Sequence, residues 1–544
     1  MTRSALLAVA AAALAVAPAR AQDIEALSAA TGIPLPPGYY ERVRANPNFF
    51  EGTREWRGRV SPQTAPGQPA VERRVVRGDL RMVVMMGLFA DSGEPPVSAG
   101  TEHEQLFGHN PLGNLTEYFS ETSGGVMSIQ GAVLPWVRTR LTLAEAVGRS
   151  YGLGEDADLE WHLRETMDLL DRNTNFAQYD NDGPDNIPNS GDDDGYVDLA
   201  VFQFAEVAAS CGNLSSVWPH RGGISGWLGW PFATDDVGAR GTPVKIDAYH
   251  IQSAVNCDGT PQSIGTIAHE TGHAFGLGDY YDSSDGLLPF QRRWVLGCWS
   301  LMAAGAWGCG DGATYGKTVS PPHMSPYEKE HLGWVTPTVT QPGWRREYVL
   351  RPIQQSGDAL MVPLLGGYEY LLLEYRTNTG FDRSLPAGGV LVYHVDRLAP
   401  PRPQGCSACR RVYPVGLVEA DGDSALVKRA DEGGNRGVAG DVFAGRRSLD
   451  DFTHPSLRLN SGQRAGVALD IEVADGVARI LVSTIPSVAS TRLLPPVLGS
   501  SGAAPSADER AALDRFGNRN GGYDLGDLRA YMRYRPGTVR QGGA

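Results

Sequence analysis

Strand and helix patterns alternate in the first half of the chain. Residues 81–89 form a nearly continuous apolar run, which is typical of a strand buried on both faces. Apolar positions spaced for one face of a helix recur at 143–151 and 159–170. Further predicted elements are a short helix at 115–119 and strands at 126–129, 132–137 and 197–205. This succession predicts a mixed domain of strands and helices over residues 76–340.

From residue 348 onward the pattern changes to short strands separated by turn signals, and no convincing helix period is present. The predicted strands cover 359–364, 369–375, 389–395, 412–418, 467–473 and 478–482. We interpret residues 341–485 as a β-sandwich domain. Residues 486–512 are rich in Ser, Pro and Ala, which predicts a linker, and 513–544 form a short closing segment. The fold class expected for the whole chain is therefore α+β.

The N-terminus has the pattern of a secretory signal. Arg3 supplies a positive start, residues 5–17 are almost all Ala, Leu and Val, and a small-x-small cleavage site ends at Ala21. This apolar run is too short to anchor the chain in a membrane, and no later stretch reaches its length. We therefore expect residues 1–21 to be a signal peptide and the protein to be secreted, either outside the cell or into the periplasm. Residues 22–75 are polar and Pro-rich and predict a removable pro-region, with a plain N-terminal extension as the alternative.

Composition and charge limit the classes of partner. The chain has 544 residues, enough for several domains with cores, and a net charge of −14. It has no basic stripe or basic tail, so the sequence does not favour nucleic acid as a partner. Its six cysteines fit an oxidising compartment, although sequence alone does not choose their pairing. Proximity favours Cys298–Cys309 and Cys406–Cys409, which leaves Cys211–Cys257.

The most specific chemical motif is His-Glu-Thr-Gly-His-Ala-Phe-Gly-Leu-Gly-Asp, which begins at His269. Two histidines four residues apart lie on one helix face, so His269 and His273 can bind the same ion. Glu270 can take a proton from a metal-bound water. Gly276 allows the positive φ that ends the helix, after which Asp279 can return as a third ligand. Three protein ligands and one water form the open arrangement of a catalytic zinc. The alternative is a solvated histidine face on an ordinary amphipathic helix.

A second segment, downstream of this motif, supports a metal site. Residues 298–308 read Cys-Trp-Ser-Leu-Met-Ala-Ala-Gly-Ala-Trp-Gly. Zinc proteases of the metzincin type have a methionine turn beneath the metal, a short distance after the ligand motif. Met302 is the candidate for such a turn. The alternative is an ordinary core methionine next to two tryptophans.

An acidic loop before the motif predicts a second kind of metal site. Residues 180–198 hold seven aspartates and no Lys or Arg. Such a density of like charge favours a bound hard cation, and the spacings resemble partial calcium loops without meeting the EF-hand pattern. The alternative is a solvated acidic loop. The calcium ligands that we predict here are Asp180, Asp182, Asp192, Asp194 and Asp198.

A loop near the C-terminus has EF-hand-like spacing and is a weaker calcium candidate. Asn518, Asn520, Asp524 and Asp527 occupy positions that carry ligands in such loops. Phe516 stands at the first ligand position, where it cannot bind a cation. Residues 513–544 therefore resemble an EF-hand or a single dockerin-type repeat but depart from both at the first ligand.

Several segments together resemble the immune inhibitor A-like family of secreted bacterial zinc metalloendopeptidases. They include the zinc motif with Tyr280-Tyr281-Asp282 after it, and the methionine turn with Trp307. Other matching segments are 120–125, 179–183, 218–220, 332–335, 369–376 and 388–396. The resemblance covers residues 80–485 and implies a metzincin-like catalytic domain, endoproteolysis of proteins, and calcium as a structural ion. Two positions depart from the pattern: Ala303 stands where serine often follows the methionine, and Asp279 stands where many metzincins have histidine.

These features predict a secreted zinc-dependent endopeptidase. His269, His273 and Asp279 would bind zinc, which lowers the pKa of its bound water towards ~7. Glu270 would take that proton and later pass it to the leaving amine. Candidates for an additional donor to the oxyanion are Tyr281, Tyr315 and His220. We expect a monomer without a membrane span that acts on protein or peptide substrates. Two alternatives are a zinc-dependent hydrolase of non-protein amides and a non-catalytic, calcium-stabilised surface-binding protein.

Overall fold

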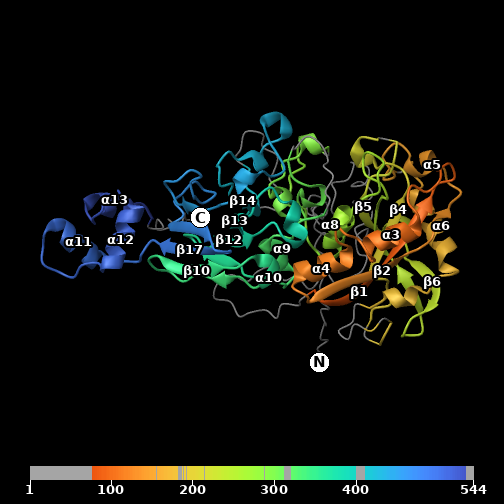
Figure 1. Cartoon of the computed structure of the whole chain (residues 1–544), viewed down its shortest axis with the longest axis horizontal. Coiled ribbons are helices and arrows are strands. Elements are labelled where there is room, and N and C mark those ends of the chain that lie inside the picture. Colours follow the sequence, from red (N-terminus) through yellow and green to blue (C-terminus); the bar gives the residue numbers. More distant parts are fainter. Residues whose placement is uncertain are drawn as a thin grey trace, which may run out of the picture.

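The computed structural model describes residues 76–154, 156–181, 187, 189–191, 193–213, 215–286, 288–310, 320–399 and 411–534. The expected signal peptide (1–21) and pro-region (22–75) lie outside these residues. The described chain is elongated, with the first sheet at one end and the C-terminal helices at the other (Figure 1).

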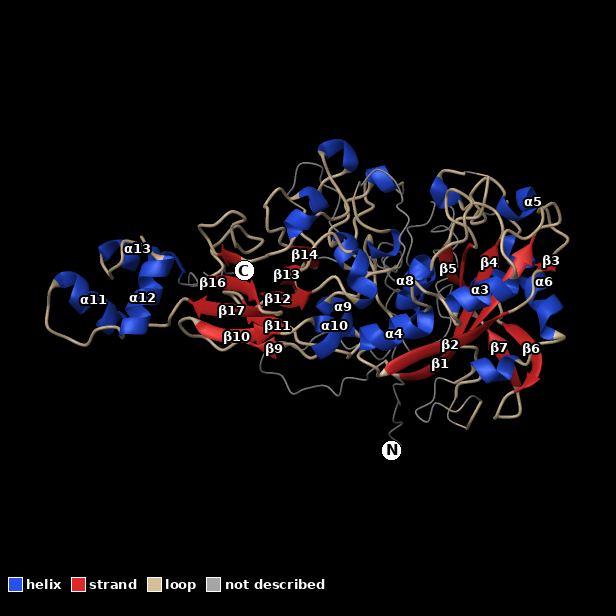
Figure 2. Ribbon diagram, viewed as in Figure 1, coloured by secondary structure: helices blue, strands red, loops and turns tan. Residues whose placement is uncertain are grey.

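A six-stranded sheet organises the first part of the chain (Figure 2). Its strand order is β2-β1-β4-β8-β5, and β3 pairs with the end of β1. All pairings are parallel except that of the edge strand β5, which is antiparallel to β8. The bounds are β1 Gly78–Leu88, β2 Met127–Val133, β3 Val137–Arg138, β4 Leu199–Phe204, β5 His220–Gly223 and β8 Ala248–Ser253. A separate two-stranded sheet pairs β6 Phe232–Val237 with β7 Pro243–Ile246.

Both faces of β1 are buried over residues 82–88, which explains the unbroken apolar sequence there. Met82 and Val84 belong to a core shared with α3, α4 and α8, whereas Val83 and Met85 belong to a core shared with α6. Successive side chains of a strand point to opposite faces, so each core takes alternate residues. The helices of this part are α3 Ala99–Leu106, α4 Leu115–Ser123, α5 Leu143–Val147, α6 Leu159–Asp171, α7 Ile224–Leu228 and α8 Ile264–Ala274. The prediction of a buried strand over 81–89 is confirmed.

Two further sheets follow. One has the order β14-β13-β12-β11-β9 and the other β10-β17-β16-β15. All their pairings are antiparallel except that of β9 with β11. Side chains of both sheets form one core, which includes Leu371 and Val392 from one and Leu469 and Ile480 from the other. The bounds are β9 Thr338–Val339, β10 Arg346–Leu350, β11 Leu360–Pro363, β12 Glu369–Arg376, β13 Gly389–Asp396, β14 Val415–Leu417, β15 Arg446–Leu449, β16 Val467–Ala474 and β17 Val477–Thr484.

The other face of β12 and β13 packs against the segment that follows the zinc motif. Leu372, Leu391 and Tyr393 share a core with Trp294 and Trp299. The strand pair is therefore buried on both faces, which explains the unbroken apolar runs at 370–373 and 389–393. It connects the core between the two sheets with the segment that contains the predicted methionine turn.

Three helices close the described chain: α11 Ser490–Leu498, α12 Ala507–Phe516 and α13 Leu525–Tyr534. Val488, Leu493, Leu513 and Tyr531 form a small core between them. The range 486–512, which we expected to be a linker, thus contains α11 and the start of α12. Composition did not reveal α11 because two prolines lie inside it, and proline is normally tolerated only in the first turn of a helix.

Several predicted elements differ from the structure. β2 ends at Val133 and β3 begins at Val137, so 132–137 is not one strand. The helix predicted over 143–151 ends at Val147, because the chain reverses at Gly148 with φ +56°. β10 and β15 were missed, since all but one or two of their residues are exposed. The short helices α9 Pro326–His331 and α10 Ile353–Ser356 were also missed, the second in a region where we expected no helix.

Two disulfides join described segments. Cys211 pairs with Cys257 and Cys298 with Cys309, at Cα–Cα distances of 5.3 and 5.0 Å. Both pairings agree with the proximity argument, whereas Cys406 and Cys409 lie outside the described residues. In the part of the chain that the structure describes, no helix has the length and apolar character needed to cross a bilayer.

Glu102 of α3 makes the stability of the first part of the chain depend on pH. The residue is buried and accepts a hydrogen bond from Gln203 Nε2 of β4 at 2.9 Å. Its Oε2 has no hydrogen-bond partner among the described residues. Burial raises the pKa of Glu102 from 4.5 to about 7, although the bond from Gln203 acts in the opposite direction. Because the folded state favours the protonated carboxyl, the free energy of unfolding falls as the pH rises through this window.

We expect Glu102→Gln to remove that loss of stability. At about pH 8 the variant should be more stable than the parent by about 2–4 kcal/mol, given about 1.4 kcal/mol per pKa unit. At about pH 4 the two proteins should be nearly equal, because both side chains are then neutral. Denaturant unfolding at the two pH values measures the difference. A parent that is as stable as the variant at the higher pH would contradict this account.

Candidate metal centre

Helix α8 brings both histidines of the motif to one buried position. His269, Glu270 and His273 are fully buried. The Nε2 atoms of the two histidines lie 3.1 Å apart, as expected for side chains one turn apart on the same helix face. Ser263 caps the start of the helix, and its side chain accepts a hydrogen bond from the backbone N–H of Gly265. The alternative of a solvated histidine face is therefore wrong.

The chain turns back after α8 and brings Asp279 to the histidines. Gly276 has φ +92°, the left-handed region that glycine adopts without strain. Asp279 Oδ1 then lies 3.2 Å from His269 Nε2 and 3.4 Å from His273 Nε2. The structure therefore brings together the three residues that we predicted as zinc ligands.

The three facing atoms have the spacing of a tetrahedral metal site. Ligands that lie about 2.0–2.1 Å from a zinc ion are about 3.3 Å apart in a tetrahedron. The observed edges are 3.1, 3.2 and 3.4 Å. His269 Nδ1 lies 2.9 Å from Leu301 O, and His273 Nδ1 lies 2.8 Å from Leu277 O. With each Nδ1–H donating to a carbonyl, each Nε2 directs its lone pair into the site, as a metal ligand must. The residues present fit a bound metal ion.

Glu270 and Asp279 are two buried carboxyl groups whose pKa values are shifted in opposite directions. Burial raises the pKa of Glu270, against the lowering effect of the two histidines. Burial also acts to raise the pKa of Asp279, but His273 and His269 lower it to about 2. Neither oxygen of Glu270 has a hydrogen-bond partner among the described residues. Asp279 therefore suits a permanently charged ligand, and Glu270 suits a group that gains and loses a proton.

Met302 lies directly against α8. A Cβ atom on Gly272 would come within 2.5 Å of Met302 Sδ, so a larger residue there would displace the methionine side chain. The Met302 backbone is held on both sides: its N–H donates to Glu328 Oε1 at 2.9 Å, and its carbonyl accepts from Tyr280 N at 2.8 Å. The predicted methionine turn is thus present beneath the helix that carries the histidines.

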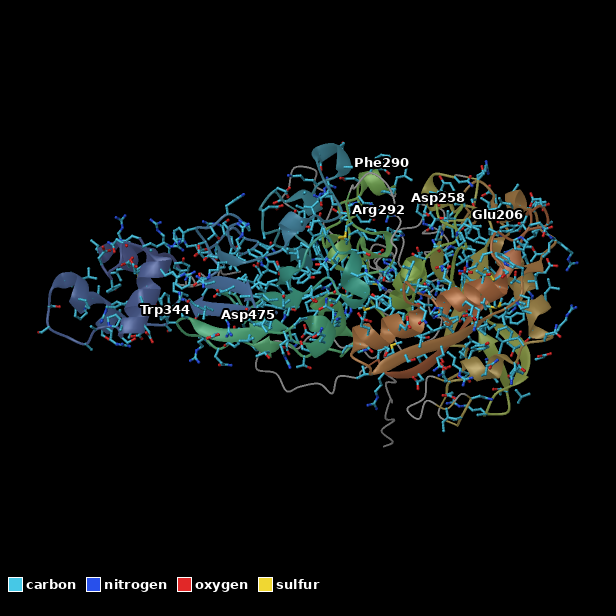
Figure 3. All side chains as sticks on the ribbon, viewed as in Figure 1. Glu206, Asp258, Phe290, Arg292, Trp344 and Asp475 are labelled. Carbon is cyan, nitrogen blue, oxygen red and sulfur yellow. A yellow bond between two sulfur atoms is a disulfide. The ribbon has the colours of Figure 1, made fainter. Side chains whose placement is uncertain are left out.

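Aromatic rings and one buried arginine lie beside this site. The Trp307 ring centroid is 5.0 Å from that of His269. The guanidinium of Arg292 lies 4.6 Å from the Tyr281 ring and 5.8 Å from the Trp307 ring (Figure 3). Cation–π contacts of this kind stabilise a guanidinium that has lost its water. Arg292 therefore gives this aromatic wall of the site a fixed positive charge.

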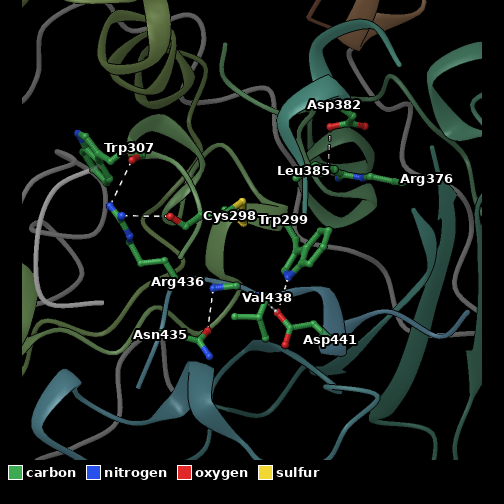
Figure 4. The surroundings of a disulfide bond; sticks show 12 residues. Cys298, Trp299, Trp307, Arg376, Asp382, Leu385, Asn435, Arg436, Val438 and Asp441 are labelled. Atoms are coloured by element: carbon green, nitrogen blue, oxygen red, sulfur yellow. Dashed lines mark hydrogen bonds and ion pairs between the residues drawn. A yellow bond between two sulfur atoms is a disulfide. The ribbon is translucent and has the colours of Figure 1, made fainter. Parts of the chain in front are cut away.

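Residues from the second part of the chain hold the methionine turn (Figure 4). The turn is closed by the Cys298–Cys309 disulfide, and Arg436 donates to the carbonyl of Cys309 at 3.1 Å. Trp299 Nε1 donates to Asp441 Oδ2 at 2.7 Å. The position of the turn therefore depends on side chains more than a hundred residues away in sequence.

Sequence reasoning missed several residues that support the site. Glu328 has a local signal, because Ser325-Pro-Tyr-Glu328 is a capping box at the start of α9. The hydrogen bond that Glu328 accepts from Met302 N–H has no such local signal in the sequence. Arg221, which donates to the carbonyl of His273 at 3.3 Å, and Arg436 are also invisible in sequence, because both act through contacts between distant segments.

The three candidates for an oxyanion donor have different surroundings. His220 is fully buried, with Nδ1 2.7 Å from Trp218 O and Nε2 3.1 Å from the Tyr249 hydroxyl. Burial lowers its pKa to about 4, so the ring is neutral at neutral pH. With both ring nitrogens engaged, His220 is poorly suited to the role. Tyr281 lies on the aromatic wall, whereas Tyr315 lies outside the described residues.

The acidic loop is described only in part. Asp182 and Asp192 lie outside the described residues. Asp180 is buried, and burial together with the charges of Asp193 and Asp194 raises its pKa to about 7. Asp198 Oδ2 accepts a hydrogen bond from the backbone of residue 181 at 2.8 Å. The described carboxylates of this loop are not among the groups of three that converge within 4.8 Å, so calcium here stays a prediction.

The C-terminal loop joins α12 and α13, and its predicted ligands lie together. Asp527 is buried and accepts from the backbone N–H groups of Asn518 and Asp524 at 2.8 and 2.9 Å. The side-chain amides of Asn518 and Asn520 lie 2.9 and 2.7 Å from the carboxylate of Asp524. These residues bond to one another, and calcium at this loop also stays a prediction.

Comparison with known proteins shows that part of this chain is similar to a peptidase family. Residues 98–335 match the family described as immune inhibitor A peptidase M6, catalytic domain. The pre-pro-metalloprotease PrtV of Vibrio cholerae serotype O1 (strain M66-2) is 26% identical over 230 residues, which are 40% of this chain and 23% of that protein. Immune inhibitor A of Bacillus thuringiensis subsp. alesti is 27% identical over 253 residues, which are 42% of this chain and 33% of that protein.

The aligned region thus spans about a quarter to a third of the length of these relatives. The converging residues His269, Glu270, His273 and Asp279 all lie inside the segment that matches the family. The family resemblance inferred from the sequence is confirmed. Residues 98–335 are thus similar to the catalytic domain of the immune inhibitor A (M6) peptidases, and this similarity supports a metallopeptidase.

Proposed function

We propose that the chain is a secreted zinc-dependent endopeptidase that hydrolyses peptide bonds in proteins. The observation that carries the proposal is the triangle formed by His269 Nε2, His273 Nε2 and Asp279 Oδ1. Beside it lies the carboxyl of Glu270, which has no hydrogen-bond partner in the part of the chain that the structure describes. Two imidazoles and one carboxylate are a common ligand set of catalytic zinc and leave one position open. A zinc ion bound there would supply an acidic water and polarise the scissile carbonyl.

The residues around the site have distinct roles in this mechanism. His269 and His273 are fixed by their carbonyl acceptors, so both present Nε2 to the site. Glu270 takes a proton from the attacking water and delivers it to the nitrogen of the leaving amine. Its buried surroundings favour this role, because a raised pKa allows the carboxyl to hold the proton between the two steps. No covalent bond between enzyme and substrate is needed.

Glu270 also distinguishes the proposal from a non-catalytic reading. Burying a carboxylate without a hydrogen-bond partner destabilises the fold, and a purely structural site has no use for one. The remaining parts of the proposal concern the whole chain. They are a signal peptide at 1–21, a pro-region at 22–75, a catalytic domain at 76–340, a β-sandwich at 341–485 and an EF-hand-like segment at 513–544. They also include calcium at the two acidic loops and a monomer that cleaves proteins outside the cytoplasm.

Glu270→Gln tests the role of the general base. We expect cleavage of casein to fall by about 10²–10⁴-fold, because the amide cannot accept the proton, while the zinc content stays at the parental level. The protein lacking residues 1–21 is assayed before and after limited proteolysis, which removes any inhibitory pro-region. Glu94→Gln, at an exposed carboxylate, is the matched control and should leave activity unchanged.

Chelation and substrate choice complete this test. Casein cleavage by the parent should be lost when a chelator removes the metal, and it should return when zinc is added. A Glu270→Gln variant as active as the parent would refute the proposed base. Zinc-loaded, folded parent that cleaves small amides but no protein would instead support the hydrolase of non-protein amides.

Asp279→Asn tests the third ligand. The amide lacks the negative charge that Asp279 retains with its pKa of about 2. We expect zinc affinity to fall by more than about 100-fold, beyond the range of about 10–100-fold that is typical of groups outside the ligand set. Competition with a chromophoric chelator measures the affinity. Unchanged affinity would exclude Asp279 as a ligand.

Glu328→Ala tests the support of the methionine turn. The variant leaves Met302 N–H and Ser325 N–H without their buried acceptor, so we expect a loss of stability of about 1–3 kcal/mol for each group. Glu328→Gln keeps one acceptor oxygen and should lose less. Denaturant unfolding of the zinc-free proteins measures both effects. Equal stability of all three proteins would show that the turn is held in place without Glu328.

A further inference from the structure

A buried arginine connects one ligand of the candidate metal centre to the six-stranded sheet. Arg221 lies on the edge strand β5, and only 5% of its surface is exposed. Its Nη1 donates to the backbone carbonyl of His273, in the last turn of α8, at 3.3 Å (Figure 1). The two residues are 52 positions apart in sequence. The contact therefore joins the edge of the sheet to the helix that carries both histidine ligands.

The carbonyl of His273 lies where α8 ends and helical donors are no longer present. The last carbonyls of a helix have no partner within it and accept from a turn, from water or from a side chain. Gly276 N donates to this carbonyl at 3.0 Å, and Arg221 supplies a second donor from another element. A cation at this end of a helix also interacts favourably with the helix dipole. Both the hydrogen bond and the charge of Arg221 thus stabilise the end of α8.

The two histidine ligands are anchored to different segments. His269 Nδ1 lies 2.9 Å from Leu301 O, in the methionine turn. His273 Nδ1 lies 2.8 Å from Leu277 O, which belongs to the turn directly after α8. The orientation of the His273 ring therefore depends on where the end of α8 lies, and Arg221 connects that end to the sheet.

The register of the sheet places Arg221 on the face that α8 covers. Arg221 is paired with His250 of β8, and directly paired residues of neighbouring strands lie on the same face. His250 is also paired with Val201 of β4, which belongs to the core shared with α8. Burial and the charge of Arg221 lower the pKa of His250 to about 3, so this ring is neutral. Arg221, in contrast, brings a permanent positive charge to the layer between the sheet and α8.

We propose that Arg221 is a positioning residue of the metal centre and sets the orientation of His273 through the backbone carbonyl of that ligand. Burying a guanidinium costs free energy unless hydrogen bonds and charges compensate for it. The carbonyl of His273 and the charge of Glu270 provide such compensation here. The inference rests on the metal centre of the proposed function, but it does not require peptidase activity.

Zinc affinity tests the proposal in the full chain. Arg221→Lys keeps a charged donor, Arg221→Gln keeps an uncharged donor, and Arg221→Met keeps only an unbranched apolar side chain. Removing a group that orients a metal ligand typically weakens metal binding by about 10–100-fold. We expect a loss of that size in Arg221→Met, a smaller loss in Arg221→Gln, and the smallest in Arg221→Lys. Competition with a chromophoric chelator measures the affinities.

The absorption spectrum of bound cobalt provides a second measurement. Cobalt in place of zinc reports the geometry of its ligands through its visible absorption. We expect Arg221→Met to change this spectrum, because His273 is displaced, and Arg221→Lys to restore it. Circular dichroism checks folding, and Arg221→Gln provides the same comparison with Arg221→Lys if Arg221→Met does not fold. Arg447→Met, at an exposed arginine of β15, is the matched control and should behave like the parent.

Three outcomes would contradict the proposal. One is a zinc affinity and a cobalt spectrum that match the parent in all three variants. Another is an equal loss in Arg221→Lys and Arg221→Met, because packing, and not the hydrogen bond or the charge, would then determine the effect. The third is a parent that binds no zinc, which would overturn the metal centre as well. A parent that binds zinc but cleaves no protein would refute the proposed function only, since both measurements read the metal and need no substrate.

Discussion

The candidate metal centre requires the scaffold to hold His269 Nε2, His273 Nε2 and Asp279 Oδ1 at distances of 3.1–3.4 Å from one another in a buried position. Lone pairs at this distance repel each other unless a cation lies between them, so the scaffold must fix all three atoms in advance. It does so through backbone carbonyls. One histidine is held by Leu301 in the methionine turn and the other by Leu277 just after α8. The orientation of the two imidazole rings therefore depends on the positions of these two segments.

The methionine turn is also where two hydrophobic cores meet. Leu301 and Met302 belong to the core under the six-stranded sheet, whereas Ala303 and Ala304, the next residues, belong to the core against β12 and β13. Four consecutive residues thus divide between two cores, and a displacement of either sheet must move the turn. The contacts of Arg436 and Asp441 act on the same segment from the second part of the chain.

The sequence predicted the features that rest on local patterns. The spacing of apolar residues and the composition of the segments predicted β1, α6, β12 and β13. The four-residue spacing of His269 and His273, followed by a glycine at position 276, indicated the ligand geometry. The features that it missed have no local pattern. β10 and β15 lack apolar alternation because they are exposed, and the bond from Met302 to Glu328 exists only because separate segments fold against each other.

The difference between local sequence patterns and contacts between distant segments also applies to the boundary between the two parts of the chain. The change in pattern near residue 340 marks where helices give way to strands, and the family match ends close by, at residue 335. The packing does not stop there: Trp294 and Trp299, before that point, lie in one core with Leu391 and Tyr393, after it. A chain that ended at residue 340 would expose these tryptophans to water and lose the groups that hold the methionine turn. The boundary therefore separates two sequence patterns, while the metal centre depends on residues from both sides of it.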